Sequence, residues 1–393
     1  MSFINSNKFP NYLLLDQKVC QLAGAIETNL LSYINPQNVE EQKKIFFDKL
    51  DKKEEYNPKF RYVPRNPLYS YFSISPTFET HKKELNAVLE DLGRDTLGLI
   101  FEKKILDLFE RMELIKSVGT PNFANNSGEY YGKVSKKLLA FAKELLEKKQ
   151  KKEGNKISFA EAKKIIDSFI KKKNLPYKII QRDSIGSKFS VNIRTKEIFI
   201  EKNIQLTNAM VKRLIAHEVE GHAYRYENGL LQPYSIFARG LSKETLETDE
   251  GIAIAVEQKE KLNVDSQLRE YAGRVVAVEI ASKKSFYDTF SALKKYFSEE
   301  DAFSISVRVK RGIHNQVEPG AFTKDALYLK GFLAVTKFLE EHPMKDLYYG
   351  RYSVYDVPLV MDVDGLKEPK YLPDCDFSFC PKKIDISLLR VKI

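Results

Sequence analysis

Apolar residues recur at helical spacing over most of this chain of 393 residues. Near the start the spacing is carried by Tyr12, Leu15, Val19 and Leu22, and Asn35-Pro36 interrupts it before residue 50. A three-to-four-residue period is typical of amphipathic helices. The same period returns in five further stretches: 78–116, 134–150, 205–227, 250–299 and 323–341. The pattern therefore predicts a mainly helical protein.

Short alternating runs predict a small sheet just before stretch 205–227. The runs are Tyr177–Gln181, Phe189–Ile193 and Ile198–Ile200, with a turn at Arg194–Glu197. Ser304–Arg311 also alternates and is expected to be a strand. The exposed edge of the small sheet is expected either to hold an extended peptide by strand addition or simply to pack on the next helix. The predicted class is α+β, mainly helical, with a small sheet flanking one helix.

That helix carries the pattern H-E-x-x-x-H at His217, Glu218 and His222. Two imidazoles suit Zn²⁺, and a carboxylate beside the first suits metal-assisted hydrolysis. On a regular α-helix a five-residue step turns about 500°, which points the second ring about 140° away. A π-bulge would return both rings to one face, and Gly221 is expected to tolerate it. The alternative is a surface helix with two unrelated histidines.

Glu250 is the expected third ligand. It follows His222 by 28 residues and is expected to begin the next helix, with Glu257 on the same face. Three protein ligands and one open position are typical of catalytic zinc. A carboxylate near a helix N-terminus is also favoured by the helix dipole alone. We expect one zinc ion per chain.

Composition narrows the class of protein. A formal net charge of +10 indicates either a solvated surface or attraction to an acidic partner, and no nucleic-acid-binding signature accompanies it. Neither a membrane-spanning apolar stretch nor a signal peptide is apparent. Three cysteines, Cys20, Cys375 and Cys380, favour a reducing cytoplasm over a disulfide framework.

Several blocks together resemble a known family. They are His217–His222, Asn228-Gly229, Gln232-Pro233, Gly240-Leu241 and Thr248–Ala253, with weaker matches from about residue 15 to about residue 340. They are similar to the QEGLA-motif family, whose bacterial members are labelled flavohemoglobin expression-modulating proteins. Its animal members resemble the microtubule-associated tyrosine carboxypeptidases. The motif that names the family, Gln-Glu-Gly-Leu-Ala, reads Asp249-Glu-Gly-Ile-Ala253 here, so the expected ligand Glu250 is kept. Asp249 in place of glutamine bears on how the metal ligands are oriented, not on metal binding itself.

The resemblance implies a zinc metallocarboxypeptidase that removes a C-terminal residue, such as tyrosine or another aromatic, from a peptide or protein. Glu218 is the expected general base, and Tyr328 is a candidate donor to the developing oxyanion. The substrate carboxylate would be bound by basic residues in two family-like blocks: Arg308, Lys310, Arg311 and Lys324. The alternative is that these residues form a solvated basic strand.

Two other functions stay open at this point. His217–His222 also fits the H-E-x-x-G-H pattern of dipeptidyl peptidase III, an enzyme that works from the amino end. A regulatory or binding protein with structural zinc, or with none, is the non-enzymatic alternative. Gly154-Asn155 and the capping signal Ser158-x-x-Glu161 place a boundary near residue 151. The expected division is an N-terminal mainly helical region, 1–150, and a zinc-peptidase catalytic region, 151–393.

Overall fold

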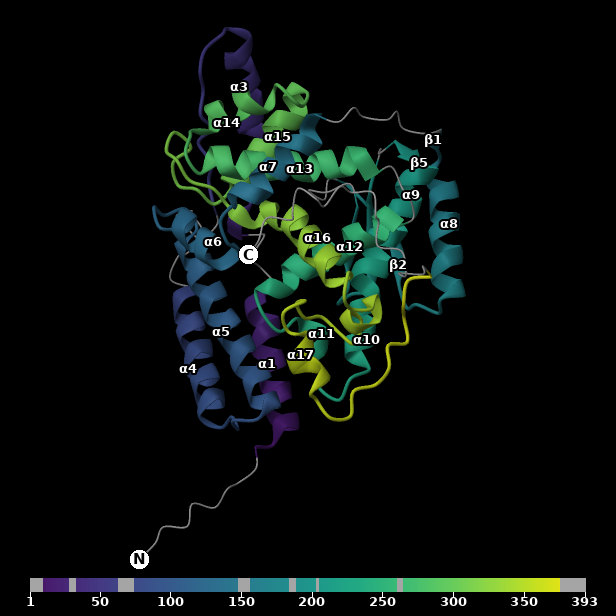
Figure 1. Cartoon of the computed structure of the whole chain (residues 1–393). Coiled ribbons are helices and arrows are strands. Elements are labelled where there is room, and N and C mark those ends of the chain that lie inside the picture. Colours follow the sequence, from purple (N-terminus) through teal and green to yellow (C-terminus); the bar gives the residue numbers. More distant parts are fainter. Residues whose placement is uncertain are drawn as a thin grey trace, which may run out of the picture.

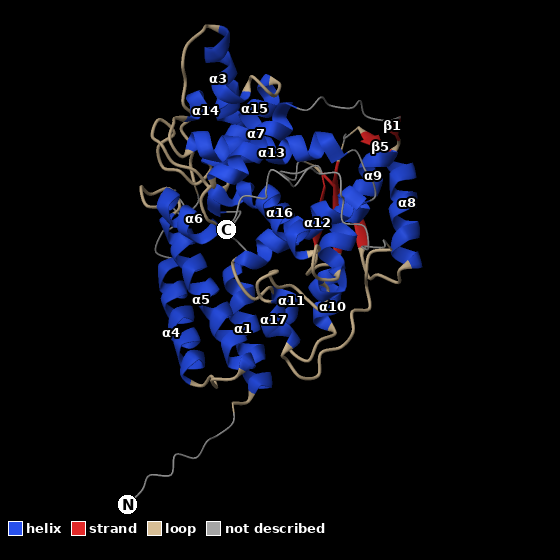
Figure 2. Cartoon of the chain, in the orientation of Figure 1, coloured by secondary structure: helices blue, strands red, loops and turns tan. Residues whose placement is uncertain are grey.

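The computed structural model describes residues 10–27, 33–62, 74–147, 156–183, 189–202, 205–259 and 264–374. Helices make up most of this part of the chain, and the strands are confined to one side of it (Figure 2). The predicted class, mainly helical with small sheets, is confirmed. Cys20 is a buried free thiol, whereas Cys375 and Cys380 lie outside the described residues.

Three helices of the N-terminal third, α1, α4 and α5, run side by side (Figure 1). Apolar side chains at helical spacing pack between them, as the sequence predicts. Asn35-Pro36 separates α1 from α3, also as predicted. The bounds are α1 Tyr12–Glu27, α3 Val39–Asp51, α4 Ile74–Glu90, α5 Thr96–Ser117, α6 Phe123–Tyr131 and α7 Lys136–Glu147.

The predicted sheet is present with the predicted turn. Its three strands, β2 (Lys178–Arg182), β3 (Phe189–Asn192) and β4 (Glu197–Glu201), lie in the order β2-β4-β3. β3 pairs antiparallel with β4, and β2 pairs parallel with it. Two shorter strands, β1 (Lys156–Ile157) and β5 (Leu206–Thr207), pair separately. Strand β3 is therefore an edge of the larger sheet.

Helices precede and follow this sheet along the chain. The predicted capping box begins α8 (Phe159–Lys172): the Ser158 hydroxyl accepts the Glu161 N–H, and the Glu161 carboxylate accepts the Ser158 N–H. The remaining elements are α9 Asn208–Leu214, η3 Ile215–Ala223, α10 Tyr224–Leu230, α11 Ile236–Arg239, α12 Glu244–Lys259, α13 Val264–Ala281, α14 Phe286–Leu293, α15 Glu299–Lys310, η4 Thr323–Ala326, α16 Leu327–Phe338, η5 Met344–Leu347 and α17 Val357–Met361.

Three boundary predictions are wrong. Ser304–Arg311 is not a strand: residues 304–310 are the C-terminal part of α15, and Arg311 is its C-cap. The helix starts at a Ser298 cap followed by acidic residues that suit a helix N-terminus. The helical stretch predicted for 205–227 does not end at 227, because α10 continues to Leu230. Glu250 does not begin its helix, because α12 starts at Glu244.

Helices α12 and α16 cross in very close contact near the centre of the molecule (Figure 1). A Cβ atom on Gly251 would lie 2.2 Å from the Gly331 carbonyl oxygen, and one on Gly331 would lie 1.8 Å from the Glu247 carbonyl oxygen. Only glycine permits two backbones to approach so closely. The crossing fixes Glu250, on α12, beside the residues just before and within α16.

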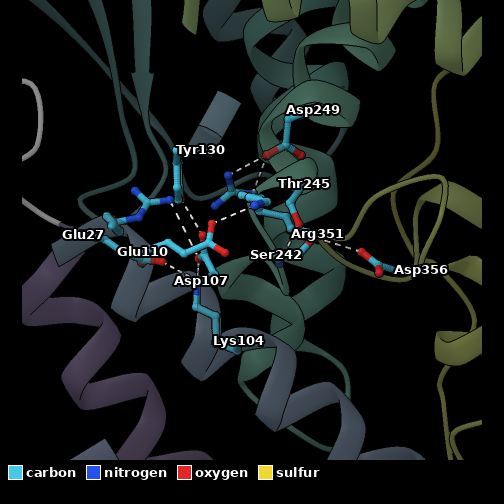
Figure 3. A network of polar contacts seen from close by, with 12 residues as sticks. Glu27, Lys104, Asp107, Glu110, Tyr130, Ser242, Thr245, Asp249, Arg351 and Asp356 are labelled. Atoms are coloured by element: carbon cyan, nitrogen blue, oxygen red, sulfur yellow. Dashed lines mark hydrogen bonds and ion pairs between the residues drawn. The ribbon is translucent and has the colours of Figure 1, made fainter. Parts of the chain in front are cut away.

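A buried polar network joins the N-terminal helices to one another (Figure 3). Lys104 on α5 donates to Glu27 on α1 at 2.6 Å and to Asp107 at 3.0 Å. The Tyr130 hydroxyl on α6 donates to Asp107 at 2.5 Å. Buried charges are tolerated only when they are paired in this way. The network holds α1, α5 and α6 in one arrangement.

One hydrophobic core contains residues from both sides of position 151, with α7 packed on α13 and α6 on η4. The division into 1–150 and 151–393 stays a proposal about sequence organisation. Within the described ranges, no helix combines the length and the apolar character needed to cross a membrane.

Candidate metal centre and substrate-binding cluster

Residues Ile215–Ala223 form a π-helix between α9 and α10, as the five-residue spacing predicts. The Tyr224 N–H donates to the Val219 carbonyl, five residues back rather than four. The additional residue per turn brings His217 and His222 onto one face. Their ring centroids lie 5.0 Å apart with the planes near perpendicular, at 80°.

Gly221 has a different role from the predicted one. It is not among the described glycines with positive φ, so the π-helix makes no use of its backbone freedom. A Cβ atom at this position would lie 2.7 Å from both Cα and Cβ of Ala253 on α12. The absent side chain therefore allows the helix with the histidines to pack directly on the helix with Glu250.

We expect Gly221→Ala to lower the free energy of unfolding by about 1–3 kcal/mol, because the added methyl group overpacks a rigid helix contact. The change should also weaken zinc binding, since η3 and α12 must separate. Denaturant unfolding and zinc titration would measure the two effects. Gly128→Ala is the matched control, because its methyl group would meet only the flexible Lys133 side chain at 3.4 Å. Equal effects of the two substitutions would contradict the packing role.

Three side chains converge on one point. The metal-ligating atoms of His217, His222 and Glu250 all lie within 4.8 Å of one another. Glu250 Oε2 is 3.6 Å from His217 Nε2 and 3.8 Å from His222 Nε2. Two atoms each about 2 Å from a tetrahedral zinc ion lie about 3.3 Å apart. The separations are close to those a bound ion would impose.

The electrostatics of these residues also fit a cation. Among the described residues, the buried Glu250 Oε2 has no hydrogen-bond partner. Burial alone would raise the pKa of Glu250, but the contact with His217 and the charge of His222 lower it to about 2. Burial opposes a charged His217, yet its contacts with Glu250 and Glu257 raise its pKa to about 10. The arrangement favours positive charge between the carboxylate and the two rings.

Glu257 is a part of this site whose role the sequence did not reveal. Its Oε1 lies 2.7 Å from His217 Nδ1 and 3.7 Å from Arg213 Nη1. A carboxylate on Nδ1 fixes the ring so that Nε2 is free to bind a metal. The seven-residue spacing from Glu250 placed Glu257 on the correct face of the helix, but only the packing of η3 on α12 brings it to His217.

Glu218, the predicted general base, follows the first ligand and is half-buried. Its Oε2 accepts the backbone N–H of Val191, on the edge strand β3, at 2.9 Å. The predicted sheet therefore flanks the metal helix and contacts its candidate base directly.

Tyr328, the predicted oxyanion donor, lies on α16 and stacks on Tyr271 of α13, with ring centroids 5.1 Å apart. Burial and the negative charge of Glu250 raise the pKa of Tyr328, so its hydroxyl stays protonated and able to donate. The guanidinium of Arg274, which no sequence pattern singled out, lies 4.8 Å from the Tyr328 ring centroid. Lys324 Nζ lies 5.6 Å from the same centroid.

Two of the predicted carboxylate-binding residues meet at Asp325. Arg308 donates to it in a bidentate pair, at 2.7 and 3.1 Å, and Arg311 Nη2 lies 3.5 Å away. Arg311 also donates to Asn35 at 3.1 Å. One fully buried carboxylate thus balances two guanidinium groups, and the fixed pair leaves net positive charge beside Lys324.

Among the predicted carboxylate-binding residues, Lys324 is the one whose charge interacts with Glu250, a candidate metal ligand. Burial lowers its pKa, and Glu250 is the largest influence acting to raise it. We define the basic cluster as Lys324, Arg308, Arg311 and Arg274.

Lys310 does not join the basic cluster, and its ammonium group is not available to bind a substrate carboxylate. Its ammonium group is buried and donates to the carbonyl oxygens of Lys284 and Glu318, at 3.1 and 2.6 Å. Because Ser304–Arg311 is helical, Lys310 and Arg311 cannot alternate across a sheet as the sequence suggested. Lys310 instead fixes the loop that follows α15.

Comparison with known proteins places the site in a family context. Residues 44–378 match the family described as "Microtubule-associated tyrosine carboxypeptidase". The mouse protein named "Putative tyrosine carboxypeptidase MATCAP2" is 30% identical over 172 residues, which are 41% of this chain and 32% of that protein. The human protein of the same name is 27% identical over a stretch of the same length.

A rat protein named "Microtubule-associated tyrosine carboxypeptidase 1" is 27% identical over 188 residues, covering 44% of this chain and 39% of the rat protein. The chain therefore matches between about a third and two fifths of the length of these relatives.

Proposed function

Because the chain belongs to the microtubule-associated tyrosine carboxypeptidase family, we propose that it is a zinc-dependent metallocarboxypeptidase. It would release the last residue of a peptide or protein chain by hydrolysis. The observation that carries the proposal is the convergence of His217, His222 and Glu250, with Glu218 next to the first histidine. The association with microtubules in the family's name favours the cytoplasm as the compartment of this protein.

Zinc would be held by His217 Nε2, His222 Nε2 and Glu250 Oε2, one ion per chain. Zinc bound there supplies a Lewis acid, which lowers the pKa of water and polarises a carbonyl oxygen. Three protein ligands leave a coordination position open, which is typical of catalytic rather than structural zinc. Glu257 holds His217 in the ring orientation and tautomer that this ligand set needs.

Glu218 would accept the proton of the attacking water and deliver it to the nitrogen of the leaving residue. The C–N bond breaks as the new C–O bond is retained, so the products are a shortened chain and a free amino acid. Tyr328 would donate a hydrogen bond to the carbonyl oxygen as negative charge develops on it. Its raised pKa keeps that proton in place at neutral pH.

The basic cluster would bind the free carboxylate of the substrate. Arg308 and Arg311 are held by Asp325. Lys324 interacts electrostatically both with these two arginines and with Glu250. A basic cluster that binds the terminal carboxylate near the metal would favour cleavage of the final peptide bond. We propose tyrosine or another aromatic as the terminal residue, following the family description.

Amidating the C-terminus of a peptide substrate is expected to lower kcat/KM by roughly 10- to 150-fold. The reason is that contacts with a charged group are worth about 1.5–3 kcal/mol, and about 1.4 kcal/mol corresponds to one decade in rate. Acetylating the N-terminus should have little effect. Mass spectrometry on a peptide library with a varied last residue would measure both effects and the terminal preference.

Lys324→Met sharpens this experiment. It should slow cleavage of the free-carboxylate peptide while leaving the amidated peptide unchanged, so that the two rates approach each other. Lys345→Met is the matched control, because Lys345 pairs with Glu368 at an exposed position. Release of N-terminal dipeptides, with amidated peptides cut normally, would favour the dipeptidyl alternative. Zinc binding without any cleavage would favour the regulatory alternative.

A further inference from the structure

We propose that the backbone N–H of Val191 is a positioning group for Glu218, and that this contact closes the edge of β3 to peptide addition at that residue. The inference rests on the proposed function, since it assigns a partner to the proposed base. It also decides between the two uses of the sheet edge that the sequence left open.

The sheet geometry makes this N–H available. Val191 is paired with Ile198 in the antiparallel ladder between β3 and β4. The N–H groups of successive residues in a strand face opposite sides. Since the Val191 N–H faces Glu218, the N–H groups of Ser190 and Asn192 face β4. Val191 is thus a point at which the edge strand offers a donor outward, and Glu218 Oε2 takes it at 2.9 Å.

A backbone donor fixes a carboxylate more firmly than a side chain can. The Val191 N–H cannot rotate away while β3 stays paired with β4, and hydrogen bonds to ionised groups are roughly twice as strong as neutral ones. Binding one oxygen of Glu218 in this way sets the orientation of the other. For a base whose proton transfer depends on hydrogen-bond reach, a fixed orientation increases the fraction of productive encounters.

The hairpin that carries Val191 is itself held at its turn. The Asn192 side-chain oxygen accepts the N–H groups of Arg194 and Thr195, at 3.1 and 3.2 Å. Arg194 Nη2 lies 3.0 Å from Glu27 Oε2 on α1. Glu27 belongs to the buried network of the N-terminal helices (Figure 3). The N-terminal region thereby supports the strand that supports the base.

The same contact limits how a peptide can bind. Strand addition at Val191 would require the peptide carbonyl to replace Glu218 on this N–H. The carboxylate would then lose its fixed orientation at the moment it is needed. The substrate must therefore lie along η3 and the basic cluster without taking this donor.

Amide hydrogen exchange at Val191 tests the contact without any catalysis. In Glu218→Ala the Val191 N–H should exchange at least about 10-fold faster than in the wild type, while Ser190 and Asn192, bonded to β4, change little. Glu218→Gln keeps an oxygen acceptor and should keep most of the protection. Unchanged exchange at Val191 in Glu218→Ala would overturn the proposal, whether or not the protein proves to be a peptidase.

The kinetic consequence is tested by replacing the Val191 amide with an ester, which removes the N–H and leaves the side chain in place. We expect kcat to fall about 10-fold with KM and zinc content unchanged, because a charge-assisted hydrogen bond is lost. The same replacement at Ser190 removes a ladder bond to β4 and should leave kcat within about twofold. Wild-type kcat in the Val191 ester, or an equal loss in both esters, would contradict the positioning role. Absence of peptidase activity in the wild type would count against the proposed function, and the exchange experiment would still decide this one.

Discussion

Glu218→Gln is expected to remove nearly all peptidase turnover while the metal site and the fold stay intact. Glutamine has the size of glutamate and still offers an oxygen to the Val191 N–H, but it cannot take a proton. General bases typically contribute about 10²- to 10⁴-fold, so kcat should fall by roughly three orders of magnitude. Hydrolysis of a free-carboxylate peptide, zinc analysis and thermal unfolding would be measured on the same preparation.

Two comparisons make this prediction specific. His217→Ala should lose zinc as well as activity, because it removes one of three ligands. Glu197→Gln, on the neighbouring strand β4, should change neither, since its carboxylate contacts Thr195 and Arg182 instead of the metal helix. A Glu218→Gln variant that turns over like the wild type would place the base elsewhere. Stoichiometric zinc in His217→Ala would remove His217 from the ligand set.

The convergence of His217, His222 and Glu250 could be predicted from sequence because the spacing of the histidines has few physical solutions. Two histidines five residues apart can bind one ion only if the helix gains a residue per turn, and η3 does so. Glu250 could be predicted because a catalytic site needs a third ligand soon afterwards. Its partner Glu257 required knowledge of how η3 packs on α12. The role of Gly221 at this contact could not be recognised for the same reason.

The basic cluster shows where sequence patterns are ambiguous. Ser304–Arg311 alternates like a strand. Just before it, however, Ser298 and the three acidic residues that follow it form a helix start. As a helix, it separates Lys310 from Arg311 and brings Arg308 and Arg311 to the same buried carboxylate. Arg274 comes from another helix, α13, and no local pattern connects it to Tyr328. Long-range packing decides the membership of this cluster.

The N-terminal region contributes to the same cluster, which sequence separation concealed. Asn35 accepts a hydrogen bond from Arg311, and the Ser127 hydroxyl accepts the Thr323 N–H at 2.8 Å, just before Lys324. Contacts that support the basic cluster therefore come from both sides of the proposed boundary near residue 151. A fragment that begins at 151 would lack both contacts.

Asp249 stands where the QEGLA motif has its glutamine, and its side chain joins three segments. Arg225 on α10 donates to its buried carboxylate. Arg351 donates to the same carboxylate at 2.6 and 3.2 Å (Figure 3). Arg225 also donates to the carbonyl oxygens of Leu347 and Tyr352, at 2.8 and 2.6 Å. The helix after the histidines, the helix with Glu250 and the segment around residues 347–352 are held together here.

Asp249→Asn is therefore expected to lower the free energy of unfolding by about 3–5 kcal/mol at neutral pH. The substitution leaves the fully buried Arg225 and the partly exposed Arg351 charged beside a neutral group, and breaking a buried ion pair from one side typically costs that much. Denaturant unfolding with zinc held in excess would measure it. The double variant with Arg351→Met should recover part of the loss, because Arg351 then no longer carries an uncompensated charge. Glu368→Gln, at an exposed ion pair, is the control and should unfold like the wild type.

The pH dependence of this loss gives the sharper test. Burial alone would raise the pKa of Asp249, but the charges of Arg351 and Arg225 outweigh it and hold the pKa below its usual value. A carboxylate with a lowered folded pKa stabilises the fold fully above its unfolded pKa of about 3.9 and loses that contribution as the pH falls further. The gap in stability between wild type and Asp249→Asn should therefore be constant from about pH 5 to 7 and shrink below about pH 4. A gap that stays constant down to pH 3 would show that the ion pairs with Arg225 and Arg351 do not stabilise the fold, and that the variant is destabilised by packing alone.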